Sequence, residues 1–143
     1  MSNLLNIFVG FDQKEAIAYH TFVQSLIENS TIPLSITPLA ENNLDHYTEK
    51  HTDGTNQFTY SRFLVPYLMN FKGWAVFADG DMVCLSDIKI LKSYFDPKKA
   101  VNVVKHNYKT KHKKKYFGQK NEDYPRKNWS SMIIWNCEHP KNK

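Results

Sequence analysis

The sequence predicts an α/β domain in which a mostly parallel sheet is flanked by helices. One observation is a strand, helix, strand pattern over residues 6–39, because such a unit is parallel and right-handed by default. Another is the short apolar run Trp74-Ala75-Val76-Phe77-Ala78, which is typical of a buried strand. The length of 143 residues predicts a single domain, 1–143, with a basic loop at about 105–127.

The first unit begins with the β-rich run 6–11, which we expect to be the first and central strand. Asp12 and Glu15 follow at the spacing of a capping box, and apolar residues then recur at helical spacing through about Asn29. Asp12 is therefore expected to cap this helix, although the end of a first strand is also where α/β folds recognise a nucleotide. Residues 33–39 alternate apolar and polar side chains and predict the second strand.

The apolar segment 58–69 predicts a helix with a kink or a late start near Arg62, because Pro66 cannot donate to the Arg62 carbonyl. Arg62 is the only charged residue in this segment, and a buried arginine needs a partner. Asp79 and Asp81, or a substrate diphosphate beside them, would provide one. The alternative is an arginine with a packed stem and a guanidinium in water.

Asp79 and Asp81 follow the run 74–78 directly and are separated by Gly80. Two like charges at a strand end are costly unless a cation or hydrogen-bond donors compensate them. Mg²⁺ or Mn²⁺ prefers carboxylate oxygens and can also bridge to substrate phosphates, and Gly80 would let a ligand approach the backbone closely. Because Asp-Gly-Asp is also a common turn sequence, a turn without a metal remains the alternative.

The rest of the chain predicts a short helix over 86–94, a strand over 100–104 and a final buried strand over 132–136. From Lys105 to Lys120 there are seven lysines and no acid, so the remainder of a chain with net charge +5 carries only −2. Interleaved aromatic residues make this tract compatible with single-stranded nucleic acid, an anionic membrane surface or acceptor, and equally with a solvated loop. Nucleic acid is the weakest of these interpretations, because no RNA-binding motif accompanies the tract.

Cys84 and Cys137 have no metal-ligand spacing and are expected to be reduced core thiols of a cytoplasmic protein. No apolar run approaches the length of a membrane span, and the first residues predict no signal peptide.

Four stretches taken in order resemble the nucleotide-binding half of family 8 glycosyltransferases, and most closely a branch of uncharacterised bacterial and phage-like members. They cover nearly the whole chain: Ile7-Phe8-Val9-Gly10-Phe11-Asp12, Tyr60-Ser61-Arg62-Phe63-Leu64-Val65-Pro66, Phe77-Ala78-Asp79-Gly80-Asp81 and Asn128-Trp129-Ser130-Ser131-Met132-Ile133-Ile134-Trp135-Asn136. The resemblance implies the GT-A (Rossmann-like) fold, truncated here after the donor-binding half. Family members continue through acceptor-binding elements and a late histidine that completes the metal site.

The resemblance also implies a metal-dependent retaining transfer of a hexose-type sugar from a nucleotide-sugar, usually a UDP-sugar, to an acceptor hydroxyl. The acceptor would be a saccharide, a lipid-linked glycan or a protein. Mn²⁺ or Mg²⁺ would be held by Asp79 and Asp81, and these two residues with Arg62 would be catalytic. The donor would contact the residues at these matching positions: Phe11, Asp12, Arg62, Asp79, Gly80, Trp129, Ser130 and Ser131. Trp129 and the two serines depart from the asparagine and small residues usual in the sugar pocket.

A second hypothesis is a catalytically silent module on the same fold that docks an anionic partner through the tract Lys105–Lys120. For either function the tract predicts contact with an anionic surface, such as the inner face of a membrane. A homo-oligomer that covers the open end of the domain is a further expectation.

Overall fold

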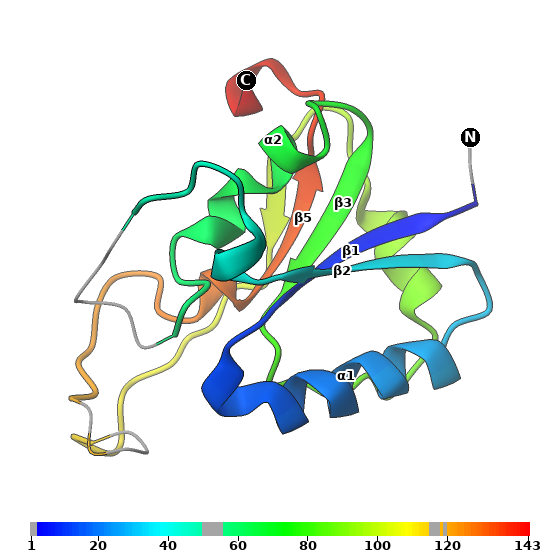
Figure 1. The fold of residues 1–143 in the computed structure, drawn as a ribbon. Helices are drawn as coiled ribbons and strands as arrows, with labels where there is room; N and C mark the ends of the chain where they lie inside the picture. Colours follow the sequence, from blue (N-terminus) through cyan, green and yellow to red (C-terminus); the bar gives the residue numbers. More distant parts are fainter. Residues whose placement is uncertain (1–2, 50–55, 115–117, 119) are drawn as a thin grey trace.

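The computed structural model describes residues 3–49, 56–114, 118 and 120–143, and its sheet has five strands (Figure 1). These are β1 (Leu5–Gly10), β2 (Leu34–Leu39), β3 (Trp74–Ala78), β4 (Val101–Val103) and β5 (Met132–Asn136), in the order β2-β1-β3-β5-β4. β1 pairs in parallel with β2 and β3, whereas β5 pairs antiparallel with β3 and β4. The prediction of an α/β domain is confirmed.

Two apolar layers cover the two faces of the sheet. The helix α1 (Ala16–Glu28) packs its buried Tyr19, Phe22 and Leu26 against one face, together with alternate residues of β1 and β3. The short helices η3 (Ser61–Leu64) and α2 (Val65–Leu68) lie beside Phe58 over the other face, where Val65 meets Phe77 and Trp135. This alternation follows from the period of two in a strand.

The strand, helix, strand unit is confirmed as β1, α1 and β2, with parallel pairing from Leu5 with Leu34 to Gly10 with Leu39. The late helix start near Arg62 is also confirmed, because η3 is a 3₁₀ turn and Pro66 lies in the first turn of α2. At this position the missing N–H of Pro66 has no energetic cost, because the first N–H groups of a helix have no partner within the helix. The helix expected over 86–94 is the 3₁₀ helix η4 (Ile88–Tyr94), capped by the Asp87 side chain.

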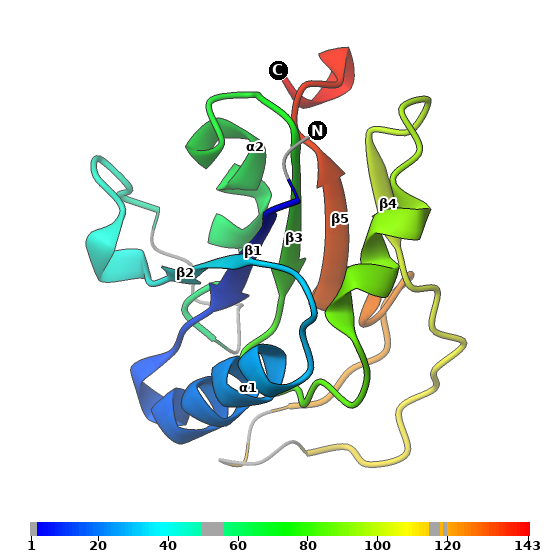
Figure 2. The same ribbon diagram turned by 90° about the vertical axis from the view of Figure 1, so that its right-hand side faces the viewer.

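The sheet is mixed but mostly parallel, as predicted, because β5 alone of the five strands is reversed and forms both antiparallel pairings. One prediction needs correction: β3, not β1, is the central strand (Figure 2). β4 and β5 are joined by residues 104–131, which contain the one-turn helix η6 (Trp129–Ser131) but no crossover helix among the described residues. Without a crossover helix the rule that favours parallel strands does not apply.

Cys84 and Cys137 are both free and buried, as predicted, and burial raises the pKa of the Cys137 thiol to about 12. Among the described residues, no helix has the length and apolar character that crossing a bilayer requires.

The end of β1 lies so close to the segment after β3 that glycine is required at position 80, and the Phe58 ring requires glycine at position 10. A Cβ on Gly80 would lie 2.3 Å from the carbonyl oxygen of Gly10, and a Cβ on Gly10 would lie 2.5 Å from the Phe58 ring. The Gly10 carbonyl therefore occupies the space beside the Gly80 Cα. The sequence instead predicted that this space is open to a ligand. The contact fixes the position of the residues on both sides of Gly80.

Gly80→Ala is expected to destabilise the fold by about 1–3 kcal/mol, because the clash is with backbone and cannot be relieved by rotating a side chain. Urea denaturation measures the free energy of unfolding. Gly73→Asn is the matched control, since Gly73 has φ +65 with nothing within 4 Å, and asparagine tolerates that conformation. Equal stability of Gly80→Ala and the parent protein would show that the two strand ends are not in contact.

Candidate functional site

The candidate site lies at the edge of the sheet where the parallel strands β1 and β3 end. Asp79 follows β3 directly, and Asp12 stands two residues after β1, at the start of the 3₁₀ turn η1 (Gln13–Glu15). Val9 pairs with Ala78, so the segments that follow these strands begin side by side. In open α/β sheets, ligands bind at this edge, beyond the carboxyl ends of the strands.

Arg62 is the buried centre of the site, and its side chain is 8% exposed. Its Nε donates to the carbonyl oxygen of Thr59 at 3.1 Å, and its Nη1 donates to the carbonyl oxygen of Ser130 at 2.7 Å. The guanidinium carbon lies 5.3 Å from the centre of the Phe58 ring and 5.0 Å from that of the Phe77 ring. These contacts fix the guanidinium against two aromatic rings and the segment before β5.

Asp79 is the ionic partner of Arg62, as the sequence predicts, with 3.0 Å between Asp79 Oδ1 and Arg62 Nη1. The Asp79 N–H donates to the carbonyl oxygen of Ser131 at 2.8 Å, which ties the end of β3 to the start of β5. Asp79 Oδ1 is buried, and within the described residues its charge is compensated by the contact with Arg62 Nη1.

The pKa of Asp79 is raised to about 7, mainly by burial; Arg62 opposes the shift, and the negative charges of Asp81 and Glu15 contribute to it. Burial is also the main cause that raises the pKa of Glu15, followed by the charges of Asp81 and Asp12. Asp81 is exposed. The charges of Asp12, Glu15, Asp79 and Asp81 thus act on one another at this edge, where Arg62 is the buried cation paired with Asp79.

Asp12 is 5% exposed, and both of its carboxylate oxygens accept hydrogen bonds from backbone amides. Oδ1 accepts from the Lys14 N–H at 2.9 Å, which confirms the capping role, and Oδ2 accepts from the Gln57 N–H at 3.1 Å. Phe11 packs its ring edge-on against Tyr19, with 5.2 Å between the ring centres. Donor recognition by Asp12 and Phe11 stays a prediction.

The turn before β5 brings Trp129, Ser130 and Ser131 to the same edge. Asn128 takes the left-handed conformation, φ 64, which asparagine tolerates, and its carbonyl oxygen accepts the Ser131 hydroxyl at 2.7 Å. Trp129 Nε1 donates to the carbonyl oxygen of His106 at 3.2 Å. Ser130 therefore accepts from Arg62 through both its carbonyl oxygen and its hydroxyl, and Ser131 accepts from the Asp79 N–H through its carbonyl oxygen. The Trp129 side chain turns toward the basic tract.

The donor set suits a hard divalent ion held by few protein ligands. Asp79 offers a carboxylate whose Oδ1 is paired with Arg62, and Asp81 offers an exposed carboxylate; at such sites Mg²⁺ or Mn²⁺ would complete its shell with water and substrate phosphates. No group of three or more histidine, cysteine, aspartate or glutamate side chains within the described part of the chain is arranged to hold a metal. Asp79 and Asp81 would thus leave most of the ligand positions of a metal to water and substrate, and metal binding stays a prediction.

Sequence reasoning assigned Glu15 only to a capping box, yet its charge raises the pKa of Asp79 across the site. The available signal was its place three residues after Asp12, in the first turn after the strand. The contact between Gly10 and Gly80 was also missed, because a local pattern does not reveal which strands are neighbours.

The chain is 43% identical over 141 residues to Protein CDI of Arabidopsis thaliana. The match covers 96% of this chain and 54% of that protein, so the chain spans about half the length of the curated relative. No family model matches the sequence, and no solved structure matches it. The similarity extends through both strand ends and the Arg62 segment.

Arg62→Met is expected to destabilise the protein by about 3–5 kcal/mol, because it leaves the Asp79 carboxylate buried without its counter-ion. In Arg62→Met/Asp79→Asn the loss should be smaller than the sum of the single losses by about 1–3 kcal/mol. Chemical denaturation of the four proteins measures this coupling. Arg126→Met, at an exposed arginine over the Trp129 ring, is the control and should cost less than about 1 kcal/mol. Additive losses would contradict the ion pair.

The pKa of Asp79, raised from 3.8 to about 7, makes stability depend on pH. Between these values the folded protein binds a proton that the unfolded chain does not, so lowering the pH stabilises the folded state. Relative to Asp79→Asn, the free energy of unfolding should rise as the pH falls from about 7 to about 4, by at most about 1.4 kcal/mol per unit. Unfolding at several pH values with a metal chelator measures this difference. If the difference in free energy of unfolding between the parent protein and Asp79→Asn stays constant, or grows with rising pH, the raised pKa of Asp79 is contradicted.

Proposed function

We propose that the chain is the donor-binding part of a metal-dependent retaining glycosyltransferase that uses a nucleotide-sugar, with a UDP-sugar as the first candidate. The observation that carries the proposal is the Asp79 carboxylate, which is 19% exposed and paired with Arg62 at the edge where β1 and β3 end. The exposed Asp81 lies two residues further along the chain. The resemblance of four sequence stretches to family 8 glycosyltransferases supports it, as does the α/β sheet, whose assignment to the GT-A type is part of the proposal.

The charges at this edge match the needs of a nucleoside diphosphate. The diphosphate cannot approach Asp79, Asp81 and Glu15 without a cation, and a divalent ion supplies the compensating charge and polarises the leaving phosphate when bound. Asp79 and Asp81 would hold that ion, and Arg62 adds a fixed positive charge beside Asp79. The hydrogen bonds that fix Arg62 prevent it from moving as charge develops, which is the condition for electrostatic stabilisation.

In the proposed reaction, the bond between the sugar C1 and the diphosphate oxygen breaks and a bond from C1 to the acceptor oxygen forms. The proton of the acceptor hydroxyl leaves with the nucleoside diphosphate. Within the described residues, the chain's contribution is binding and charge compensation. Phe11, Asp12, Gly80, Trp129, Ser130 and Ser131 are the proposed neighbours of the donor. The acceptor is a saccharide, lipid-linked glycan or protein, and its binding would involve elements outside the matched half of the longer relative.

An alternative function is binding without catalysis on the same fold. Within the described residues, no third side chain joins Asp79 and Asp81 to hold a metal, and this observation supports the alternative. It predicts nucleotide binding that does not respond to metal, or no nucleotide binding at all.

Titration calorimetry of UDP, UDP-glucose and UDP-galactose with Mn²⁺ and with EDTA tests the proposal. Binding should require the metal, and Asp81→Asn should weaken it by at least about tenfold without changing stability, because Asp81 is exposed and a carboxylate ligand is lost. Metal-dependent binding should also strengthen as the pH rises through about 7, where Asp79 loses its proton.

Asp45→Asn is the matched control, since it removes an exposed carboxylate from the polar segment after β2. If Asp81→Asn binds the donor with undiminished metal dependence, the site assignment is wrong. If the folded parent protein binds none of these nucleotides in Mn²⁺, the proposed donor function is wrong.

A further inference from the structure

A basic lobe projects from the sheet edge that carries the carboxylates. We use this name for the described residues of 104–128, which leave β4 and return to β5 and are yellow to orange in Figure 1. Val103 pairs with Ile133, and Ala78 pairs with Met132, so the lobe begins and ends beside the carboxyl end of β3. The lobe and the candidate site therefore share one end of the molecule.

The lobe is organised by a buried ammonium group and differs from the solvated loop that the sequence left open. Lys127 is 5% exposed, and its Nζ donates to Thr110 Oγ1 at 2.9 Å, to Asn121 Oδ1 at 2.7 Å and to the carbonyl oxygen of Glu122. The rings of Tyr108 and Tyr124 lie over the same ammonium, with their centres 5.8 and 5.3 Å away. All three donors of the ammonium are used, and two ring faces stabilise its charge.

Backbone and side-chain contacts join the two sides of the lobe. The Asn121 N–H donates to the carbonyl oxygen of Lys113 at 2.9 Å, and Lys114 forms an antiparallel bridge with Lys120. The Thr110 N–H and hydroxyl both donate to Asp123 Oδ1, and these bonds lower the pKa of Asp123 below its usual range. The result is an irregular two-stranded projection.

The lobe has a strong positive charge on its surface. In sequence, residues 105–127 contain eight lysines and one arginine against two acids, a net charge of +7. The two acids are Glu122, which is paired with Lys120, and Asp123, which is bonded to Thr110. Six of the lysines are exposed in the structure: Lys105, Lys109, Lys111, Lys113, Lys114 and Lys120.

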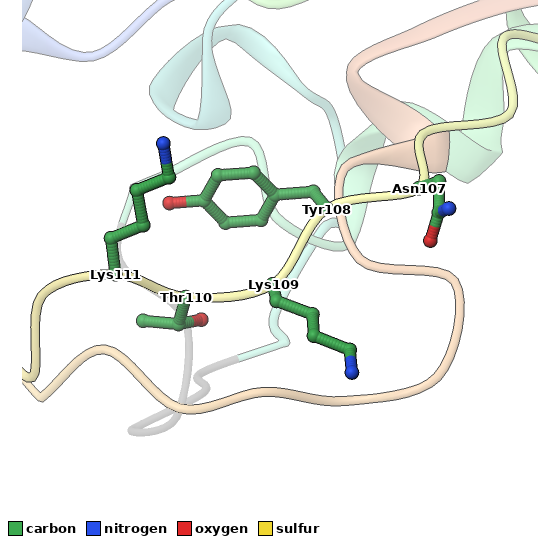
Figure 3. Close-up of a pocket in the computed structure, with 5 residues that line it drawn as sticks. All are labelled: Asn107, Tyr108, Lys109, Thr110 and Lys111. Carbon is green, nitrogen blue, oxygen red and sulfur yellow. The ribbon is translucent and has the colours of Figure 1, made fainter.

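The cationic groups do not converge on one small anion. An open hollow of about 560 Å³ runs along residues 107–111, and Figure 3 shows Lys109 and Lys111 extending to different sides of the chain there. Lysines dominate over arginine, whose planar fork would suit bidentate recognition of a single phosphate. This distribution suits many anionic groups spread over a surface.

Cations lie over one face of the tyrosine rings in the described part of the lobe and over the ring of Trp129, which follows the lobe. Lys127 lies over Tyr108 and Tyr124, and Lys105 and Arg126 each lie 5.8 Å from the centre of the Trp129 ring. Single-stranded nucleic acid binding relies on free ring faces on which bases stack. Tyr108 and Tyr124 nevertheless remain 43% and 55% exposed, and tyrosine is favoured at the headgroup level of membranes.

We propose that the basic lobe docks the protein on an anionic phospholipid surface. Its exposed lysines would contact lipid phosphates and carboxylates, and the two tyrosines would lie at the headgroup level. Because the lobe starts beside the end of β3, docking holds the edge with Asp79 near the lipid surface. The proposal does not depend on the donor function, since no residue of the carboxylate site takes part.

Sedimentation with vesicles tests the proposal, in EDTA and without nucleotide. The protein is mixed with pure phosphatidylcholine vesicles or with vesicles of equal parts phosphatidylcholine and phosphatidylserine. We expect binding to the anionic vesicles alone, with loss of binding in about 1 M salt. Lys109→Gln/Lys111→Gln/Lys113→Gln should weaken binding on the order of a hundredfold, because each lysine near an anionic leaflet strengthens binding roughly fivefold.

The matched control is Lys98→Gln/Lys99→Gln/Lys141→Gln, which removes the same charge from exposed lysines away from the lobe. This control should bind anionic vesicles nearly as well as the parent protein. Equal losses in the two triple variants would overturn the proposal, as would no sedimentation of the folded parent with anionic vesicles at low salt. Binding to polyuridylate or polyglutamate without binding to vesicles would overturn it in favour of a polymeric partner.

Discussion

The buried ion pair between Arg62 and Asp79 connects parts of the chain that are far apart in sequence. Arg62 comes from the turn beside Phe58, Asp79 ends the central strand, and Ser130 accepts from Arg62 just before β5. A guanidinium this deep is tolerable because carbonyl oxygens, a carboxylate and two ring faces share its charge. The segment over one sheet face, the central strand and the returning strand thus meet at one group.

The same end of the molecule carries two opposite charge distributions. At the sheet edge, burial and the proximity of Asp81 and Glu15 raise the pKa of Asp79, so the carboxylates lack sufficient compensation from the protein alone. In the basic lobe, the Lys127 ammonium is buried and hydrogen-bonded, and the other described lysines are exposed to solvent. A cation with a diphosphate suits the first region and an extended anionic surface suits the second, so the two proposed interactions are chemically separate.

Much of the fold was predictable because its signals are local. The period of β1, the capping Asp12, the helical spacing of α1 and the placement of Pro66 each depend on neighbouring residues. The partner of Arg62 was also predictable, since a lone charge in an apolar segment and an aspartate after a buried strand each need compensation. The reversed direction of β5 was not, because two strand signals separated by a long basic tract carry no information about how they pair.

The sequence by itself determined the α/β class, the strand that Asp79 follows, the capping of the turn before the first helix by Asp12 and the concentration of charge between Lys105 and Lys120. The tertiary structure decided that β3 is central, that Gly80 is required by the Gly10 carbonyl, that the charges of Asp81 and Asp12 raise the pKa of Glu15 and that Lys127 is buried. The first group follows from spacing along the chain. The second depends on contacts between distant segments, which exist only once the sheet and the lobe have formed.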